Sequence, residues 1–208
     1  MFDTAVSRFY PIVDADFCRD REVSPREVAA ACFRGGARIL QLRVKSGSSA
    51  DFLSLAAAVV LEARRFGAAV IVNDRADLAR MANAAGVHVG QDDLPAAEVR
   101  AMAPAALIGL STHSPEQVAD GLSSAADYLA VGPIFGTNTK ATGYDARGLD
   151  LVRAAAGRGK PVVGIGGITL ERAASVIQAG AAAVAVISDV LAGGDPEART
   201  RDYLRALS

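Results

Sequence analysis

Short apolar runs alternate along the chain with longer Ala-rich stretches in which apolar positions recur at helical spacing. Eight apolar runs predict strands: Arg8–Val13, Ile39–Arg43, Ala69–Asn73, Val87–Val89, Ala106–Leu110, Tyr128–Val131, Pro161–Ile165 and Ala183–Ile187. Eight amphipathic stretches predict helices: Pro25–Phe33, Ala50–Arg65, Ala76–Ala84, Ala96–Met102, Pro115–Ser123, Gly148–Arg158, Leu170–Ala179 and Pro196–Ala206. Strands that alternate with helices, without a long interruption, predict an α/β fold with parallel strands.

The number of strand–helix units decides between two parallel architectures. Eight units in 208 residues predict a single (β/α)₈ TIM barrel, one catalytic domain spanning residues 1–208. An open, doubly wound sheet is the alternative that the same alternation permits. In a barrel, function lies in the loops that follow the strands, so polar residues at those ends are the candidates to inspect.

Composition and charge narrow the class of protein. Apolar residues make up 51% of the chain and charged residues 22%, which is typical of a globular domain. The formal net charge is −1, without the basic excess that indicates a nucleic-acid surface. Cys18 and Cys32 indicate neither a disulfide framework nor a zinc site, and no apolar stretch reaches the ~18 residues of a membrane span. We expect a cytoplasmic protein without a nucleic-acid or membrane partner, and a homo-oligomer remains open.

Polar side chains occupy one face of the second predicted strand. Because side chains alternate along a strand, Gln41, Arg43 and Lys45 share a face opposite Leu40 and Val44. Cations that point into a barrel are costly unless they meet an anion or water. At the barrel mouth, Arg and Lys would clamp a di- or triphosphate. The alternative is a strand end in solvent with scattered charges.

Carboxylates follow the third and fourth predicted strands. Two hard oxygen ligands together with substrate phosphates are a usual way to hold Mg²⁺, so Asp74 and Asp93 are the predicted metal ligands. The alternative for Asp92-Asp93 is a cap on the following helix. His88 lies within the apolar fourth strand and is interpreted as a packed core histidine without a catalytic role.

The loops after the fifth and sixth strands offer further donors. Ser111 could donate to a substrate, whereas His113 has no visible partner and is weak evidence for an acid or base. The loop after the sixth strand is long and polar, and such loops often act as lids. Thr137, Thr139 and Lys140 in this loop offer donors for phosphate oxygens, and a mobile surface loop is the alternative.

The last two strands end in a pattern that favours phosphate binding. Gly166-Gly167 follows the seventh strand, and Ile187-Ser188 follows the eighth. In (β/α)₈ enzymes these two loops frequently bind phosphate through backbone N–H groups and a helix N-terminus. Adjacent glycines allow the backbone to approach such a ligand closely.

These blocks together resemble thiamine-phosphate synthase over nearly the whole chain. The most specific pieces are Gln41-x-Arg43-x-Lys45, Asn73-Asp74-Arg75, Gly86-Val-His-Val-Gly-Gln-Asp-Asp93, Ser111-Thr-His113, Thr137-x-Thr139-Lys140 and Gly166-Gly167-Ile168. The resemblance implies a transferase that uses Mg²⁺, joins an aminopyrimidine methyl diphosphate to a thiazole phosphate and releases pyrophosphate.

The resemblance also implies a role for each matching residue. The pyrimidine diphosphate would be held by Gln41, Arg43, Lys45, Asn73 and Lys140, with Ser111 on the pyrimidine side. The thiazole phosphate would be held by Thr137, Thr139, Gly167, Ile187 and Ser188, and Mg²⁺ by Asp74 and Asp93. Arg43, Ser111 and Lys140 are the candidate catalytic residues. We expect a dissociative substitution, which needs neutralised charge and positioning more than proton transfer.

The chain departs from the family pattern at two positions. Val44 stands where the family usually has Glu, and we expect altered support for the neighbouring cations. Gly136 replaces a common Pro, which should loosen the loop. Two alternative functions remain, a thiazole tautomerase on the same barrel and a non-catalytic protein that binds a phosphate ligand. Another phosphate-binding barrel, such as an isomerase of amino-acid biosynthesis, would explain the glycines but not the paired aspartates.

Overall fold

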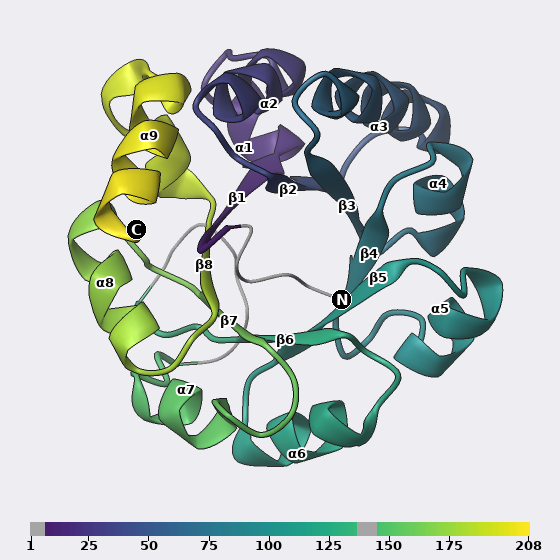
Figure 1. Cartoon of the computed structure of the whole chain (residues 1–208). Helices are drawn as coiled ribbons and strands as arrows, with labels where there is room; N and C mark the ends of the chain where they lie inside the picture. The colour runs from purple at the N-terminus through teal and green to yellow at the C-terminus, as the bar shows by residue number, and fades with distance from the viewer. Residues whose placement is uncertain (1–6, 137–144) are drawn as a thin grey trace.

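The computed structural model describes residues 7–136 and 145–208, and these form a closed barrel of parallel strands (Figure 1). The strands are β1 (Phe9–Asp14), β2 (Ile39–Arg43), β3 (Ala69–Asn73), β4 (Gly86–Val89), β5 (Leu107–Thr112), β6 (Tyr128–Val131), β7 (Val162–Ile165) and β8 (Ala183–Val186). Each strand pairs in parallel with its neighbour in the chain, and β8 pairs with β1. The predicted (β/α)₈ barrel is confirmed and the open sheet is excluded.

Helices surround the barrel on the outside (Figure 1). They are α1 (Ala15–Arg19), α2 (Pro25–Arg34), α3 (Ser49–Arg64), α4 (Ala76–Met81), α5 (Ala96–Met102), α6 (Pro115–Ser123), α7 (Asp150–Ala155), α8 (Leu170–Gln178) and α9 (Pro196–Ala206), with the 3₁₀ segment η1 (Ser188–Gly194). Three helices begin with a capping residue followed by Pro. Ser24, Ser114 and Asp195 accept hydrogen bonds from backbone N–H groups in the first turns of α2, α6 and α9.

Several elements differ from those that the sequence predicts, and helix α7, for example, spans Asp150–Ala155 instead of Gly148–Arg158. Helix α1 is additional, and it begins because the Asp14 carboxylate accepts hydrogen bonds at 3.0 Å from the N–H groups of Asp16 and Phe17. Helix α4 ends at Met81 instead of Ala84, and Asn83 beyond it adopts a left-handed φ of 54°. Segment η1 is also additional. Elements of one or two turns leave too little periodicity to be recognised in a sequence.

Two apolar layers hold the barrel together. Inside it, Tyr10, Ile12, Ile71 and Tyr128 pack with neighbours from the other strands. Outside it, the opposite faces of the strands pack against the helices, and Leu40 and Leu42 are fully buried there with Val44 at the margin of the same layer. The alternation predicted for β2 is therefore confirmed, and it sends Gln41 and Arg43 into the barrel.

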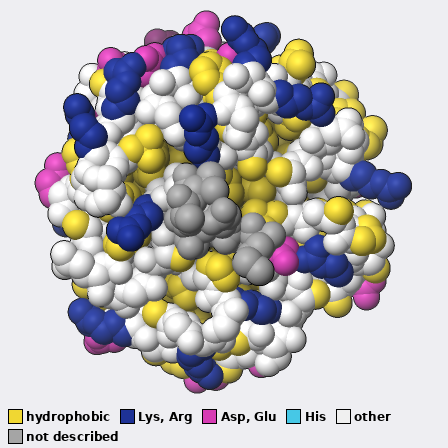
Figure 2. All heavy atoms as spheres, in the orientation of Figure 1, with side chains coloured by type: hydrophobic (Ala, Val, Ile, Leu, Met, Phe, Trp, Pro, Cys, Tyr) yellow, Lys and Arg dark blue, Asp and Glu magenta, His cyan; other side chains and the backbone are white. Residues whose placement is uncertain are grey.

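The structure also shows the lengths of the helices and the distribution of charge on one face. No helix in the described part of the chain is long and apolar enough to cross a membrane. On the face shown in Figure 2, Lys and Arg side chains are scattered both at the edge and nearer the centre, and they do not form one basic patch. Cys18 and Cys32 are both buried and free.

Candidate active site at the barrel mouth

A chain of buried polar side chains crosses the inside of the barrel. The Gln41 amide nitrogen donates to the Tyr10 hydroxyl at 3.2 Å, and the Tyr10 and Tyr128 hydroxyls lie 3.0 Å apart. The Tyr128 hydroxyl lies 3.1 Å from His88 Nδ1, and His88 Nε2 lies 2.9 Å from Ser111 Oγ. These hydrogen bonds therefore connect Gln41 on β2 with Ser111 on β5, two residues that the sequence predicts at the substrate site.

Gln41, at one end of this series of hydrogen bonds, indicates which atoms donate and which accept. An amide nitrogen only donates, so the Tyr10 oxygen accepts from Gln41 and its own hydrogen is available for Tyr128. Burial raises the pKa of both phenols, which keeps them protonated as donors. With the His88 tautomer that carries its hydrogen on Nε2, the Ser111 oxygen accepts this hydrogen bond and its own hydrogen can point at a ligand.

Gly109 makes room for the centre of the chain. A Cβ atom at this position would lie 2.2 Å from the Tyr128 ring and 2.3 Å from His88 Nδ1, so any side chain would force the two rings apart. The sequence interpretation of His88 as a packed core histidine is thus incomplete. His88 is buried, but it faces the barrel interior and bonds to Ser111.

Two buried donors in the same pocket lack a partner. Arg43, Asn73, His88 and Ser111 all line this pocket. Within the described residues, Arg43 Nε and Asn73 Nδ2 make no hydrogen bond although both atoms are buried. An unsatisfied buried donor costs about 1–3 kcal/mol, so their position favours a ligand that accepts from them.

Arg43 is held by a residue that the sequence did not single out. Its Nη1 atom pairs with the Asp14 carboxylate, which is 4% exposed and also begins helix α1. Tyr10, Ile12 and Asp14 alternate toward the interior of β1, and this parity was the signal that could have identified Asp14. The support for Arg43 therefore comes from Asp14 on β1.

The two predicted metal ligands lie together at the rim. Burial raises the pKa of the Asp93 carboxyl, and the neighbouring Asp74 carboxyl raises it further. Lys45 Nζ lies 2.5 Å from Asp74 Oδ2, and the Gly90 N–H donates to Asp93 Oδ2 at 2.7 Å. Asp74 adopts a φ of 62°, a left-handed conformation that is strained for a residue other than glycine.

This arrangement fits a divalent cation that takes few protein ligands. Among the described residues there is no cluster of three or more His, Cys, Asp or Glu side chains that would form a closed metal site. Two adjacent carboxylates whose charges repel each other are suited to Mg²⁺, which usually binds one or two carboxylates and completes its shell with water and substrate phosphates. Asp74 and Asp93 are therefore the residues that would hold it.

The opposite side of the mouth is built from backbone. Gly166 and Gly167, directly after β7, have φ angles of 100° and 61°. A Cβ atom at Gly167 would lie 2.5 Å from the carbonyl oxygen of Gly136, so the loop has no space for a side chain. Strands β7 and β8 pair in register, so the loop after β8, with Ile187 and Ser188, lies beside these glycines. Such a surface presents N–H groups to an anion.

Comparison with known proteins identifies the family. A family model described as thiamine monophosphate synthase matches residues 9–190, which is most of the chain. The chain belongs to this family. The match covers every strand of the barrel and both sides of the mouth described above.

Named members of the family are similar over almost their full length. The thiamine-phosphate synthase of Koribacter versatilis is 44% identical over 205 residues, covering 96% of this chain and 95% of that protein. The thiamine-phosphate synthase of Roseiflexus sp. strain RS-1 is 43% identical, covering 92% and 81%. The solved structure of thiamine phosphate pyrophosphorylase from Pyrococcus furiosus superposes with a TM-score of 0.86 at 28% identity, covering 96% and 95% of the two chains. The resemblance read from the sequence and the prediction of a transferase are confirmed.

The remaining predicted residues divide into two groups. Thr137, Thr139 and Lys140 lie outside the described residues, so their roles remain predictions. The helix-cap alternative for Asp92-Asp93 is not what the structure shows. The residue before α5 is Pro95, which makes no side-chain cap, and Asp93 bonds to Gly90 instead.

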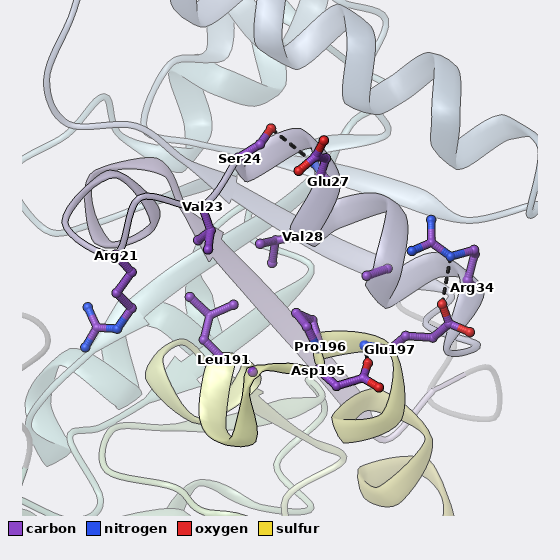
Figure 3. Close-up of a pocket in the computed structure, with 12 residues that line it drawn as sticks. Arg21, Val23, Ser24, Glu27, Val28, Arg34, Leu191, Asp195, Pro196 and Glu197 are labelled. Atoms are coloured by element: carbon purple, nitrogen blue, oxygen red, sulfur yellow. Dashed lines mark hydrogen bonds and ion pairs between the residues drawn. The ribbon is translucent and has the colours of Figure 1, made fainter.

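A second groove lies on the outer surface of the protein and is a weaker candidate for a functional site. Figure 3 shows this groove of about 470 Å³ between α2 and the start of α9. Most of its polar side chains already have structural partners. Ser24 and Asp195 cap helices, Arg34 pairs with Glu197 at 2.7 Å, and the Arg21 guanidinium lies 3.4 Å from the centre of the Phe17 ring. The barrel mouth, where buried donors lack partners, is the better site.

Proposed function

We propose that the protein joins an aminopyrimidine methyl diphosphate to a thiazole phosphate, giving thiamine phosphate and pyrophosphate. The proposal depends on one observation: unpaired buried donors and a cluster of charged side chains lie together at the rim of the barrel. Arg43 Nε and Asn73 Nδ2 are buried without a partner among the described residues, next to a Lys45–Asp74–Asp93 cluster. A diphosphate with its metal would supply acceptors for these donors and, in addition to Lys45, a further positive charge for the two adjacent carboxylates.

The buried polar chain supports recognition of an aminopyrimidine. With Gln41 donating to Tyr10, its amide oxygen is left to accept from an exocyclic amino group. The Ser111 hydroxyl hydrogen is directed to an acceptor such as a ring nitrogen. The Gln41 oxygen on β2 and the Ser111 hydroxyl on β5 thus provide one acceptor and one donor, which match the amino group and a ring nitrogen of an aminopyrimidine. A site built for such groups rejects analogues that lack them.

The rim residues would bind the leaving group. Arg43, held by Asp14, would form charge-assisted hydrogen bonds to the diphosphate, and Lys45 would turn from Asp74 toward it. Asp74 and Asp93 would hold Mg²⁺, which would supply positive charge for the departing pyrophosphate. Lys140, from the loop after β6, would add a further cation.

The chemistry then needs positioning more than proton transfer. The bond between the pyrimidine methylene carbon and the diphosphate oxygen breaks, and both bonding electrons leave with pyrophosphate. The positive charge spreads over the aminopyrimidine. The thiazole nitrogen donates its lone pair to the methylene carbon and forms the new C–N bond. The thiazole phosphate, held by the loops after β7 and β8, places that nitrogen in line.

Pyrophosphate release tests the proposal directly. The purified protein is mixed with both substrates and Mg²⁺, and pyrophosphate and thiamine phosphate are measured over time. We expect equimolar formation of the two products, and none when the thiazole phosphate is omitted. A tautomerase would interconvert thiazole isomers and release no pyrophosphate. A binding protein would retain thiazole phosphate in calorimetry without forming product. Either result would replace the proposed function.

A further inference from the structure

We propose that Arg199 of the C-terminal helix is a positioning residue for the thiazole-phosphate side of the site, acting through Asp189. The inference rests on the proposed function, because it concerns the same phosphate loops. Arg199 holds and neutralises a carboxylate that joins the loop after β7 to the loop after β8. Without Arg199, that carboxylate would remain charged beside the phosphate.

The Asp189 carboxylate is the meeting point of three elements. Its Oδ2 atom accepts hydrogen bonds from Arg199 Nη2 at 2.7 Å and Nε at 3.1 Å, and from the Tyr203 hydroxyl at 2.5 Å. It also accepts from the backbone N–H of Leu170 at 3.2 Å. Asp189 directly follows Ser188 in η1, whereas Leu170 is the first residue of α8. One carboxylate thus links the two loops that flank the predicted phosphate site.

The bond to Leu170 fills a role that α8 otherwise lacks. Thr169 occupies the N-cap position of α8 but makes no side-chain cap hydrogen bond. The Asp189 carboxylate supplies this cap from the neighbouring loop and lies at the positive end of the helix dipole. It therefore sets the start of α8 relative to Gly167, only three positions earlier in the chain.

The position of this carboxylate is unfavourable for a phosphate site unless its charge is neutralised. Asp189 follows Ser188, which is predicted to contact the phosphate, and an unpaired carboxylate next to that residue would repel the anion. The Asp189 side chain is 12% exposed and that of Arg199 is 18% exposed, so water screens the pair only weakly. The Arg199–Asp189 pair is overall neutral, which lets the anion bind beside it.

The pair is anchored in the core. The Tyr203 ring stacks on Phe9 of β1 with 4.4 Å between ring centres, and both residues are fully buried. Arg199 Nε also donates to the backbone oxygen of Asp189 at 3.3 Å, which orients the guanidinium along η1. Helix α9 therefore contributes to the site although none of its residues is among those predicted to touch substrate.

The test compares a single variant, a double variant and a matched control. Arg199→Gln leaves the Asp189 charge in place without its partner. We expect it to raise the KM for the thiazole phosphate about tenfold, while kcat and the KM for the pyrimidine diphosphate stay within about twofold. In Asp189→Asn/Arg199→Gln the charge is gone and an amide oxygen still faces Leu170, so most of the affinity should return. Arg201→Gln, which removes an exposed arginine paired with Glu197 on the same helix, is the matched control and should leave all constants unchanged.

Direct binding separates this inference from the proposed function. Calorimetry with inorganic phosphate as the probe should show weaker binding to Arg199→Gln than to the unmodified protein and recovery in the double variant. This readout holds even if the protein forms no thiamine phosphate. Equal rises in both KM values, or a double variant as weak as Arg199→Gln, would overturn the inference and leave Arg199 with a structural role only. Thermal unfolding of each variant confirms that folded protein is compared.

Discussion

The two sides of the barrel mouth bind anions by different means. The side-chain half, at the ends of β1 to β4, uses charged groups from separate strands, with Arg43, Lys45, Asp74 and Asp93 at its centre. The backbone half, at the ends of β7 and β8, uses the glycine loop after β7 and the start of η1, and the Arg199–Asp189 ion pair lies behind it. The side-chain half therefore binds an anion through charged side chains, whereas the backbone half binds one through the conformation of its loops.

The difference matches what each half is proposed to hold. A departing pyrophosphate gains charge during the reaction, so groups that stabilise it must respond to that change. The thiazole phosphate keeps its charge and only needs to be placed. In the side-chain half Arg43 pairs with Asp14 and Lys45 with Asp74, and a diphosphate would have to draw Lys45 away from Asp74. The backbone half is formed in advance by its φ angles.

The largest expected effect is the loss of a carboxylate from the side-chain half. Asp93→Ala removes one of the two proposed Mg²⁺ ligands, and we expect kcat/KM to fall by about two to three orders of magnitude, as for loss of a group that stabilises transition-state charge. A steady-state assay across a Mg²⁺ titration measures this effect. The metal concentration for half-maximal activity should also rise.

The neighbouring residue supplies the control for this variant. Asp92→Ala removes an exposed carboxylate of the same loop and should keep activity within about twofold of the unmodified protein. If Asp93→Ala and Asp92→Ala behave alike at saturating Mg²⁺, the side-chain half does not hold the metal, and the contrast between the two halves loses its chemical basis.

The sequence predicted the side-chain half better than the backbone half and its supports. Alternation along β2 placed Gln41 and Arg43 inside the barrel, because a strand with one apolar face has only one acceptable register. Asp74 and Asp93 could be expected to meet because the ends of neighbouring parallel strands lie at one rim. These are local rules, and the structure satisfies them.

Residues that act through distant partners were not predictable in this way. Asp14 supports Arg43 across 29 positions of sequence, and Tyr128 reaches His88 across 40. A buried tyrosine in an apolar strand reads as ordinary core until its hydroxyl partner is known. Asp189 follows a strand as Asp74 does, but nothing in the sequence indicates that Arg199 neutralises it. Contacts of this kind depend on the closure of the barrel.

The second prediction tests the backbone half by changing shape without changing charge. Gly167→Ala forces a methyl group to within 2.5 Å of the Gly136 oxygen, so the loop must shift. We expect the KM for the thiazole phosphate to rise about tenfold, with the KM for the pyrimidine diphosphate little changed. Steady-state kinetics with each substrate varied in turn separates the two constants.

A glycine elsewhere on the barrel distinguishes local strain from a general loss of stability. Gly157 also has a positive φ, 72° against 61° for Gly167, but a Cβ atom there would meet nothing within 4 Å. Gly157→Ala should cost about 1 kcal/mol of folding stability, like any alanine in a left-handed conformation, without affecting either KM. If Gly157→Ala raised the KM for thiazole phosphate as much as Gly167→Ala, the effect would come from loosening of the fold and not from the shape of the loop.

The smallest expected effect concerns the buried, hydrogen-bonded side chains between the two halves, which are proposed to recognise the pyrimidine. Tyr128→Phe keeps the ring but removes the donor to His88, so the direction of donation toward Ser111 is no longer set. We expect kcat/KM for the pyrimidine diphosphate to fall about threefold to fivefold and the KM for the thiazole phosphate to stay constant, since one neutral hydrogen bond contributes about 1 kcal/mol.

The control removes a buried hydroxyl outside this series of hydrogen bonds. Thr112→Val on β5 deletes a hydroxyl that donates to the Ala130 carbonyl oxygen on β6, and it should lower stability by a similar amount without changing either constant. A Tyr128→Phe enzyme with unchanged constants would mean that Ser111 orients its hydrogen without the chain. Pyrimidine recognition would then reside in Gln41 and Ser111 alone.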